Sequence, residues 1–385
     1  MWFNNINVYQ LHNNEALDSI ALNDMLAGDA AKPLGSADAS RYGWTPPAGR
    51  ASNVYLHESQ GHRLISMLKQ ERILPGSVVK EALEEKVEEI ETREGRKVTR
   101  KEKTALKEQI TEELLPRAFV KSTKIDAWWD IRRNRIIINS ASRTRCEELL
   151  DLLRQTLGSL KVTPLSTQTL PVRAMTDWLG DASTRPANLA LRDKATLKAK
   201  GDDGKIAANQ VDLDSDEIQQ LLESGRLATE LAVTINDNVS AVLTENLTLK
   251  SLRYGDKLIE QADAQDDGDD RIARLESDFF LMANALADAI DSLTAMLGGI
   301  SERTEAPPAE QGTRPDDSHP GEQVGGFEDE DPEYPRAILI AQQRENVTVT
   351  KLQRGLTIGY NRAQRLHEQL IRDGHIPNSY GQHGV

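Results

Sequence analysis

Residues 73–121 read ILPGSVVKEALEEKVEEIETREGRKVTRKEKTALKEQITEELLPRAFVK, and this stretch decides how the rest of the chain is organised. After Pro75-Gly76, apolar residues recur at helical spacing at Val79, Leu83, Val87 and Ile90. Thr99 and Glu102 form a capping-box pattern that opens a second helix, which ends at Leu115-Pro116. The stretch therefore predicts a charged pair of antiparallel helices that projects from a larger body.

The segments on either side of this hairpin mix strand and helix patterns. Residues 3–11 alternate like an opening strand, and residues 128–138 are typical of a β-hairpin that turns near Arg133-Asn134. A second β-hairpin is expected over 231–243, with its turn at Asn236-Asp237. These patterns predict an α+β body.

Two further helices are expected in this body. Thr144 and Glu147 form another capping-box pattern, before a helix that runs to Leu157. The last helix carries one apolar face from Phe279 to Leu297 and ends at Gly298-Gly299.

The body is expected to span residues 1–300, and a different composition follows it. Residues 301–333 are rich in proline and glycine and contain eleven acidic residues, opposed only by Arg303 and Arg314. So few apolar residues cannot build a core, which predicts a disordered acidic linker.

Residues 334–385 then predict a compact module of three helices, with a turn at 355–359 before the third helix. This order describes a helix-turn-helix, and the tail after Gly374 could form a wing.

Composition narrows the class of protein. The chain has 385 residues and a formal net charge of −14, which by itself argues against a nucleic-acid partner. No run approaches the ~20 apolar residues of a membrane helix, and no secretory signal is recognised at the start. The single cysteine, Cys146, excludes an intramolecular disulfide and a cysteine-based zinc site. We expect a cytoplasmic, nucleoid-associated protein.

No motif for catalysis, a metal or a cofactor is recognised. The chain has no phosphate-binding P-loop and no dinucleotide-binding glycine pattern. His57-Glu58 and His62 are spaced one residue too far apart for a zinc-protease helix. The acidic run 263–270 places Arg274 where a calcium loop needs a glutamate. Cys146 is expected to be a buried structural residue. We predict no enzyme activity. The alternative is a nuclease whose site is built from scattered carboxylates.

A local excess of positive charge over 93–145 is the first candidate for binding DNA, because a DNA site needs local rather than net positive charge. The alternative is an ordinary solvated helical face. Arginine suits phosphate, and a belt that contacts several phosphates would bind without sequence preference and lose affinity steeply with salt. The residues expected to contact DNA are Arg96, Lys97, Arg100, Lys101, Arg117, Lys121 and Lys124.

The third helix of the C-terminal module is the second candidate. Asn361, Arg365 and Glu368 share one helix face, and these residue types suit the edges of adenine, guanine and cytosine. Phosphate contacts are expected from Arg362, Lys351 and Arg354. Leu366 and Leu370 would face the module's core. The alternative is a polar face of an ordinary small helical domain.

Residues 1–300 resemble the RdgC family of bacterial recombination-associated proteins. The matching stretches include Gly43-Trp44-Thr45-Pro46-Pro47, Ile73-Leu74-Pro75, residues 114–119 (LLPRAF) and Leu249-Lys250-Ser251-Leu252. The resemblance implies a homodimeric ring with a basic hole that encloses duplex DNA and limits access of the recombinase RecA. It also implies that Phe119 lies near the gate where the ring closes, and that Arg117 lies near the DNA.

Residues 334–385 resemble the DNA-orienting gamma domain of the translocase FtsK, a winged helix. The resemblance is carried by Leu352-Gln353-Arg354, residues 358–363 (IGYNRA), Arg365 and Glu368-Gln369. It implies that Asn361, Arg365 and Glu368 read a short G-rich motif, and that the module can contact the recombinase XerD. No motor motif is recognised in residues 1–385, and we expect a shorter wing than the family's because the sequence stops at Val385.

Two binding hypotheses from different classes follow. In the first, a ring holds duplex DNA non-specifically and a tethered winged helix reads sequence nearby, because tethering raises local concentration to roughly millimolar. In the second, the protein is an adaptor whose winged helix mainly grips a recombinase such as XerD. A nuclease or other enzyme is a third hypothesis, which incubation with labelled DNA and magnesium would test.

Overall fold

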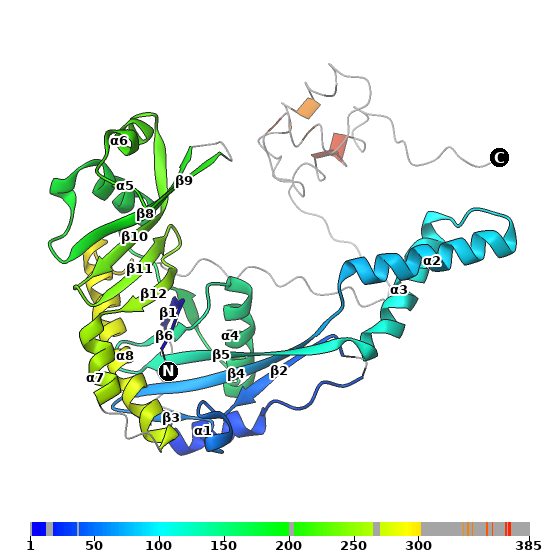
Figure 1. Ribbon diagram of the computed structural model, residues 1–385, viewed down its shortest axis with the longest axis horizontal. Coiled ribbons are helices and arrows are strands. Elements are labelled where there is room, and N and C mark those ends of the chain that lie inside the picture. Colours follow the sequence, from blue (N-terminus) through cyan, green and yellow to red (C-terminus); the bar gives the residue numbers. More distant parts are fainter. Residues whose placement is uncertain are drawn as a thin grey trace, which may run out of the picture. The chain divides into compact units, whose positions relative to one another are not determined.

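The computed structural model describes residues 2–12, 18–36, 38–199, 204–264 and 270–301, together with ten residues between Tyr334 and Leu370. Contacts divide the chain into two units, Met1–Pro307 and Pro308–Val385. The predicted linker lies almost entirely outside the described residues, as does most of the predicted winged helix. The predicted α+β class of the body is confirmed, since helices and antiparallel strands make up the first unit (Figure 1).

A seven-stranded antiparallel sheet forms one half of this unit. Its order is β2-β4-β5-β6-β1-β7, and β3 pairs with β4 beside β2. The strands are β1 (Asn7–Leu11), β2 (Ser40–Thr45), β3 (His57–Ser59), β4 (His62–Ile73), β5 (Phe119–Asp130), β6 (Arg135–Ile138) and β7 (Val162–Pro164).

The predicted turn between β5 and β6 is confirmed, and Asn134 adopts a left-handed conformation there (φ 51°). The first strand begins later than expected. Phe3 and Ile6 are fully buried, and the backbone of Ile6 bridges to Leu249 in the second sheet.

Each face of the seven-stranded sheet has its own hydrophobic core. Helices α1 (Ser19–Gly28) and α4 (Arg143–Leu157) cover one face, where Leu26 and Leu153 pack with Trp129. Trp128 points to the opposite face and joins the core that contains helix α8 (Arg271–Met296). Successive strand residues face opposite sides, so the two tryptophans are core residues of opposite faces.

One predicted helix boundary was wrong. Helix α4 begins at Arg143 with Ser142 as its N-cap, so Thr144 and Glu147 lie inside the helix and form no capping box. The spacing of a capping box also occurs within the first turn of a helix, and sequence alone does not separate the two.

A five-stranded antiparallel sheet of order β12-β11-β10-β8-β9 forms the other half of the unit. Its strands are β8 (Leu189–Ala199), β9 (Lys205–Asn209), β10 (Arg226–Ile235), β11 (Val239–Thr244) and β12 (Leu249–Tyr254). The predicted turn after β10 is confirmed, because Asn236 and Asp237 both have positive φ (52° and 55°).

Helices α5 (Pro171–Gly180), α6 (Asp216–Glu223) and α8 place apolar residues in one core with this sheet, and α7 (Asp256–Ala264) packs on α8. Short 3₁₀ turns occupy Gly49–Ala51, Leu115–Arg117 and Ala182–Thr184. Helix α8 is long and apolar enough to cross a membrane by length and composition alone, but 56% of its most apolar stretch of 18 residues is buried inside the protein. It is the central helix of the core.

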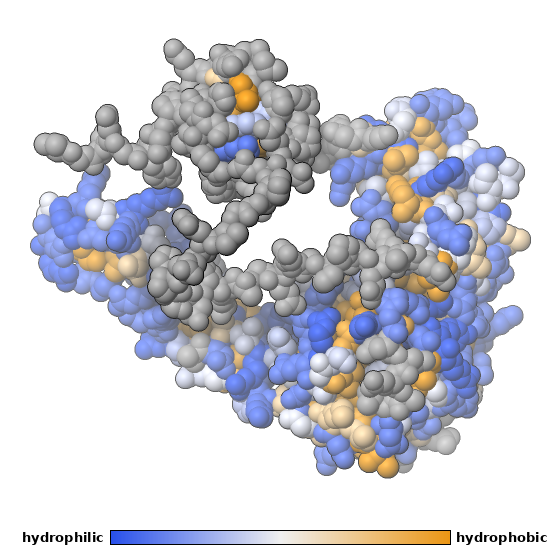
Figure 2. Space-filling model, turned by 180° about the vertical axis from the view of Figure 1, so that it is seen from behind, coloured by the Kyte–Doolittle hydropathy of each residue, from blue (hydrophilic) through white to orange (hydrophobic). Residues whose placement is uncertain are grey.

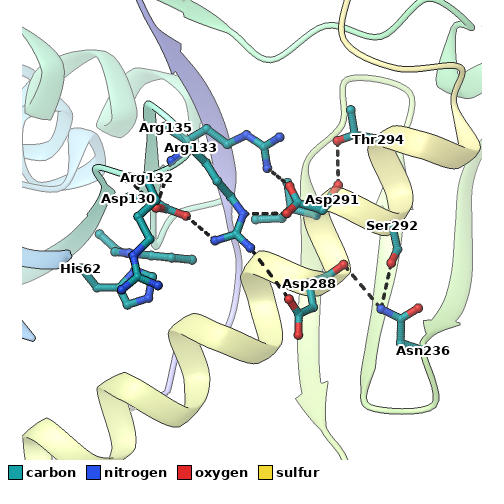
Figure 3. Close-up of polar contacts among 12 residues, drawn as sticks. His62, Asp130, Arg132, Arg133, Arg135, Asn236, Asp288, Asp291, Ser292 and Thr294 are labelled. Carbon is teal, nitrogen blue, oxygen red and sulfur yellow. Dashed lines mark hydrogen bonds and ion pairs between the residues drawn. The ribbon is translucent and has the colours of Figure 1, made fainter. Parts of the chain in front are cut away.

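A network of ion pairs joins the seven-stranded sheet to α8 (Figure 3). Arg133 Nε donates to Asp291 Oδ2 at 2.6 Å, and Arg135 Nη1 donates to Asp291 Oδ1 at 2.6 Å. On the other side of the helix, Asn236 Nδ2 donates to Ser292 Oγ at 2.9 Å. Helix α8 is therefore tied to a turn of each sheet.

Candidate nucleic-acid interface

The predicted helical hairpin is confirmed as α2 (Gly76–Glu94) and α3 (Arg100–Leu114), which extend from the ends of β4 and β5 (Figure 1). Helix α2 ends at Gly95, whose left-handed conformation (φ 65°) suits a residue without a side chain. Thr99 and Glu102 form the predicted capping box at the start of α3. These local signals fix the hairpin because its helices pack mainly on each other.

At the tip of the hairpin, Arg96, a predicted DNA contact, instead binds a carboxylate of the hairpin itself. Arg96 donates two hydrogen bonds to the carboxylate of Glu102, at 3.0 and 2.8 Å. Together with the bonds from Thr99, Arg96 lowers the pKa of Glu102 to about 2. The positive charge of Arg96 is therefore largely neutralised by Glu102, and this ion pair stabilises the turn between α2 and α3.

Lys97, Arg100 and Lys101 are exposed at this tip, and no ion pair involves them within the described part of the chain. The surface of the hairpin is predominantly hydrophilic (Figure 2). Helix α2 also carries seven glutamates, so the positive charge concentrates at the tip instead of along both helices. The tip can make phosphate contacts, while the flank of α2 would repel them.

A second group of predicted residues lies at the base of the hairpin. Arg117 ends the 3₁₀ turn and is exposed, with no ion-pair partner among the residues described. Lys121 lies 3.8 Å from Glu71 across the β4–β5 ladder and keeps a half-exposed side chain. Lys124 is less available, because its ammonium donates to the Pro47 carbonyl oxygen at 2.7 Å and pairs with Asp126 at 2.9 Å.

Arg72 is a positioning residue that sequence reasoning missed. Its guanidinium donates to the carbonyl oxygens of Pro116 (3.0 Å) and Ala118 (3.3 Å), which flank Arg117. It also donates to the carbonyls of Gly35 and Asp38, at 3.2 Å each. Arg72 thus anchors the turn that presents Arg117. A lone arginine in a strand gives no sequence signal of this role, which depends on the register that puts Arg72 opposite Val120.

Phe119 is 86% exposed at the start of β5, directly opposite Ile73, which is 48% exposed. Directly opposed residues lie on the same face of a sheet, so these two side chains form a small apolar patch at the base of the hairpin. The high exposure of Phe119 makes this pair a candidate protein-contact surface.

The predicted continuous belt over 93–145 is divided by the structure. Arg133 and Arg135 belong to the network with Asp291, and Arg135 is only 6% exposed. Arg143 and Arg145 lie in the first turn of α4, an element separate from the hairpin. The basic residues of the belt therefore do not share one surface, because neighbours in sequence were distributed over different elements.

His57, His62 and Cys146, the residues that could suggest metal or nucleophile chemistry, pack within the fold. The part of the chain that the structure describes contains no group of three or more histidine, cysteine, aspartate or glutamate residues arranged to hold a metal. His57 and His62 lie on β3 and β4, and the Nδ1 of His62 accepts a hydrogen bond from Trp128 Nε1 at 3.1 Å. Cys146 is buried as predicted, and burial raises the pKa of its thiol.

The predicted base-reading and phosphate-binding residues of the C-terminal module lie outside the described residues. These are Lys351, Arg354, Asn361, Arg362, Arg365 and Glu368. Leu366 and Leu370 are buried together with Leu352, Leu356 and Tyr334, which confirms the prediction that these two leucines face a core.

Comparisons with known proteins match two families to different parts of the chain. A family model described as "Putative exonuclease, RdgC" matches residues 1–300, and one described as "Ftsk gamma domain", a winged-helix domain, matches residues 328–383. Recombination-associated protein RdgC of Aeromonas hydrophila is 39% identical over 300 residues, which cover 78% of this chain and 98% of the relative. The protein of the same name from Pseudomonas aeruginosa PAO1 is 40% identical over 301 residues, with 78% and 98% covered.

Proposed function

The chain belongs to the RdgC family of recombination-associated proteins and carries an Ftsk gamma domain, and from that premise we propose that residues 1–300 bind double-stranded DNA without catalysing a reaction on it. The observation that carries the proposal is the placement of exposed cations at both ends of the hairpin. Arg117 is held outward at the base by Arg72, and Lys97, Arg100 and Lys101 cluster at the tip. Such contacts suit phosphates and do not read sequence.

In this proposal two copies of the chain form a ring around the duplex. The exposed apolar pair Ile73 and Phe119 supports it, because an exposed phenylalanine at the base of a projecting hairpin suits a contact between subunits. A ring on the duplex would occupy the substrate of RecA and so limit strand exchange. We place this activity in the cytoplasm, on the nucleoid.

The Ftsk gamma domain would add sequence preference. Its proposed readers are Asn361, Arg365 and Glu368, and the segment that tethers it would keep it near DNA already held by the body. Replacing Asn361 and Arg365 by alanine should remove preference for a G-rich orienting motif and leave affinity for random duplex unchanged. If the wild-type chain shows no motif preference, contact with a recombinase such as XerD becomes the better function for this domain.

The experiment that tests the body measures affinity for random duplex DNA by fluorescence anisotropy at several salt concentrations. The variant Arg117→Glu/Lys121→Glu should lose at least tenfold in affinity, since each phosphate contact contributes a salt slope of about 0.9. Its control is Lys80→Glu/Lys86→Glu, which makes the same charge change on the same hairpin at lysines that pair with Glu84 and Glu89. Equal effects of the two variants would refute a specific role for the hairpin base.

The absence of catalysis is tested separately. End-labelled duplex incubated with the protein and magnesium should keep its length, and progressive shortening would show that the chain is a nuclease.

A further inference from the structure

A groove of about 550 Å³ lies along the hairpin helix α2, and none of the predicted DNA contacts lines it. Leu83 and Val87 give the groove an apolar lining, and the carboxylates of Glu84, Glu88 and Glu91 line it as well. We propose that this groove binds a partner protein through a basic amphipathic helix of that partner. The inference is independent of the proposed DNA binding, because carboxylates repel phosphates.

The groove follows from the spacing of apolar residues on α2. Val79 is buried and Leu83 and Ile90 are half-buried, and their spacing puts them on one side of the helix. Val87 lies at the edge of this stripe, so its side chain is only half-buried. Leu83 and Val87 are about one helical turn apart and line the groove together. The hairpin therefore leaves a short apolar strip that α3 does not fully cover.

Two of the carboxylates beside this strip are available to a ligand. Glu84 lies 3.5 Å from Lys80, but their side chains are 68% and 76% exposed, so the pair is weak. Glu88 is exposed, and no ion pair involves it within the residues that the structure describes. Glu91 is half-buried and accepts a hydrogen bond from the backbone N–H of Val98 at 3.0 Å. A cation can therefore approach Glu84 and Glu88, whereas Glu91 is held within the hairpin.

The cations that line the groove do not cancel its acidic character. They are Lys80 and Lys103, and Lys103 is the one lining residue that α3 supplies. Helix α2 as a whole carries seven glutamates against three basic residues. The potential around the groove is therefore negative, and it favours a ligand that carries several lysine or arginine residues.

An apolar strip beside carboxylates matches the surface that an amphipathic helix needs. Such a helix inserts apolar side chains at positions i, i+3, i+4 and i+7 into a groove, and its charged residues flank the contact. The apolar side chains of the partner would cover Leu83 and Val87, and its lysines or arginines would pair with Glu84 and Glu88. A wholly hydrophilic ligand would leave the strip exposed, and an acidic ligand would be repelled.

A second copy of this chain is a poor occupant of the groove. Helix α3 has the suitable charge, since it carries four basic residues. However, its apolar residues Leu106, Ile110 and Leu114 are buried or half-buried. A second copy of α3 therefore supplies positive charge without an exposed apolar stripe, and the occupant is a different protein.

The probe for this groove is a fluorescein-labelled peptide of leucine and lysine, about 18 residues long, which forms about five helical turns. Its leucines are placed at helical spacing, and a second peptide has the same composition in scrambled order. Binding to the full chain is measured by anisotropy at about 0.15 M salt, where distant charges are screened. The patterned peptide should bind at least about tenfold more tightly than the scrambled one, since only its leucines can cover the strip together.

The charge test compares Glu84→Gln/Glu88→Gln with the control Glu81→Gln/Glu85→Gln. Both variants remove two negative charges from α2, but Glu81 and Glu85 do not line the groove. Glutamine and glutamate have similar helix propensity, so both variants should fold, and circular dichroism melting checks this. The groove variant should lose at least about fivefold in affinity for the patterned peptide, and the control should stay within about twofold.

The apolar lining is tested by Val87→Gln, which removes an apolar side chain and favours the helix more than valine does. This variant should also lose about fivefold in affinity for the patterned peptide. Equal losses for the two glutamate variants, or equal binding of the two peptides, would overturn the inference, because the peptide would then sense only the overall charge of α2. Sedimentation velocity supplies the remaining outcome: a change of oligomeric state in Val87→Gln would show a contact between copies of this chain and would refute a separate partner.

Discussion

Replacing Asp291 of α8 by alanine should loosen the joint between the seven-stranded sheet and the central helix. Asp291 accepts hydrogen bonds from both Arg133 and Arg135 at 2.6 Å. Arg133 keeps Asp130 as a second partner at 3.3 Å, but the guanidinium of Arg135 loses its carboxylate. The Nε of Arg135 is already buried without a hydrogen-bond partner, so the variant leaves a buried cation poorly satisfied.

The size of the effect follows from burial. Breaking a fully buried ion pair costs about 3–5 kcal/mol, because the remaining charge is left uncompensated. The side chain of Arg135 is 7% exposed and that of Asp291 is 41% exposed, so water recovers part of the loss. We expect the free energy of unfolding to fall by about 2 kcal/mol. For a unit of this size that lowers the melting temperature by about 3 °C.

Thermal melting followed by circular dichroism measures this shift on the full chain. The matched control is Asp151→Ala, which removes the partner of Arg154 from an exposed pair on α4 and should change the melting temperature by less than about 1 °C. Equal shifts for Asp291→Ala and Asp151→Ala would refute the reasoning, because the buried network would then be worth no more than a surface pair. A cycle with Arg135→Met should show coupling of at least about 1 kcal/mol.

Two further predictions concern pH and the hairpin. Burial lowers the pKa of both His57 and His62 below 6.5 in the folded protein. Just below pH 6.5 the unfolded chain therefore binds more protons than the folded chain does. The stabilising contribution of the neutral histidines should be fully present above pH 6.5 and fall as the pH drops toward their lower pKa values in the folded protein. The melting temperature should fall between pH 7.5 and 5.5 and fall less in His57→Gln, whereas an unchanged pH slope would count against a buried neutral His57. Thr99→Ala should cost about 1 kcal/mol at the start of α3 and speed amide exchange there. Thr104→Ala, an exposed threonine inside the same helix, should leave that exchange rate nearly unchanged, and equal rates in the two variants would contradict the role of the cap.

Features that depend on neighbours along the chain could be predicted from local sequence patterns. The two helices of the hairpin, the capping box at Thr99 and the turn at Asn236-Asp237 follow from helical period, side-chain capping and backbone preference. Each depends on interactions between residues only a few positions apart. The same local logic failed at Thr144, because the spacing of a capping box recurs inside a helix.

Which charges share a surface depends on the three-dimensional fold and could not be predicted from local patterns. Arg133 and Arg135 are close in sequence to Lys121 yet belong to the joint with α8, while Lys194, Lys205 and Arg253 meet on one face of a sheet although they are scattered along the chain. Arg72 anchors the turn at Arg117 through a pairing across 44 residues. The physical reason is that an electrostatic surface depends on distance in space, and that distance is set by strand register and helix packing, which bring together residues that no local pattern relates.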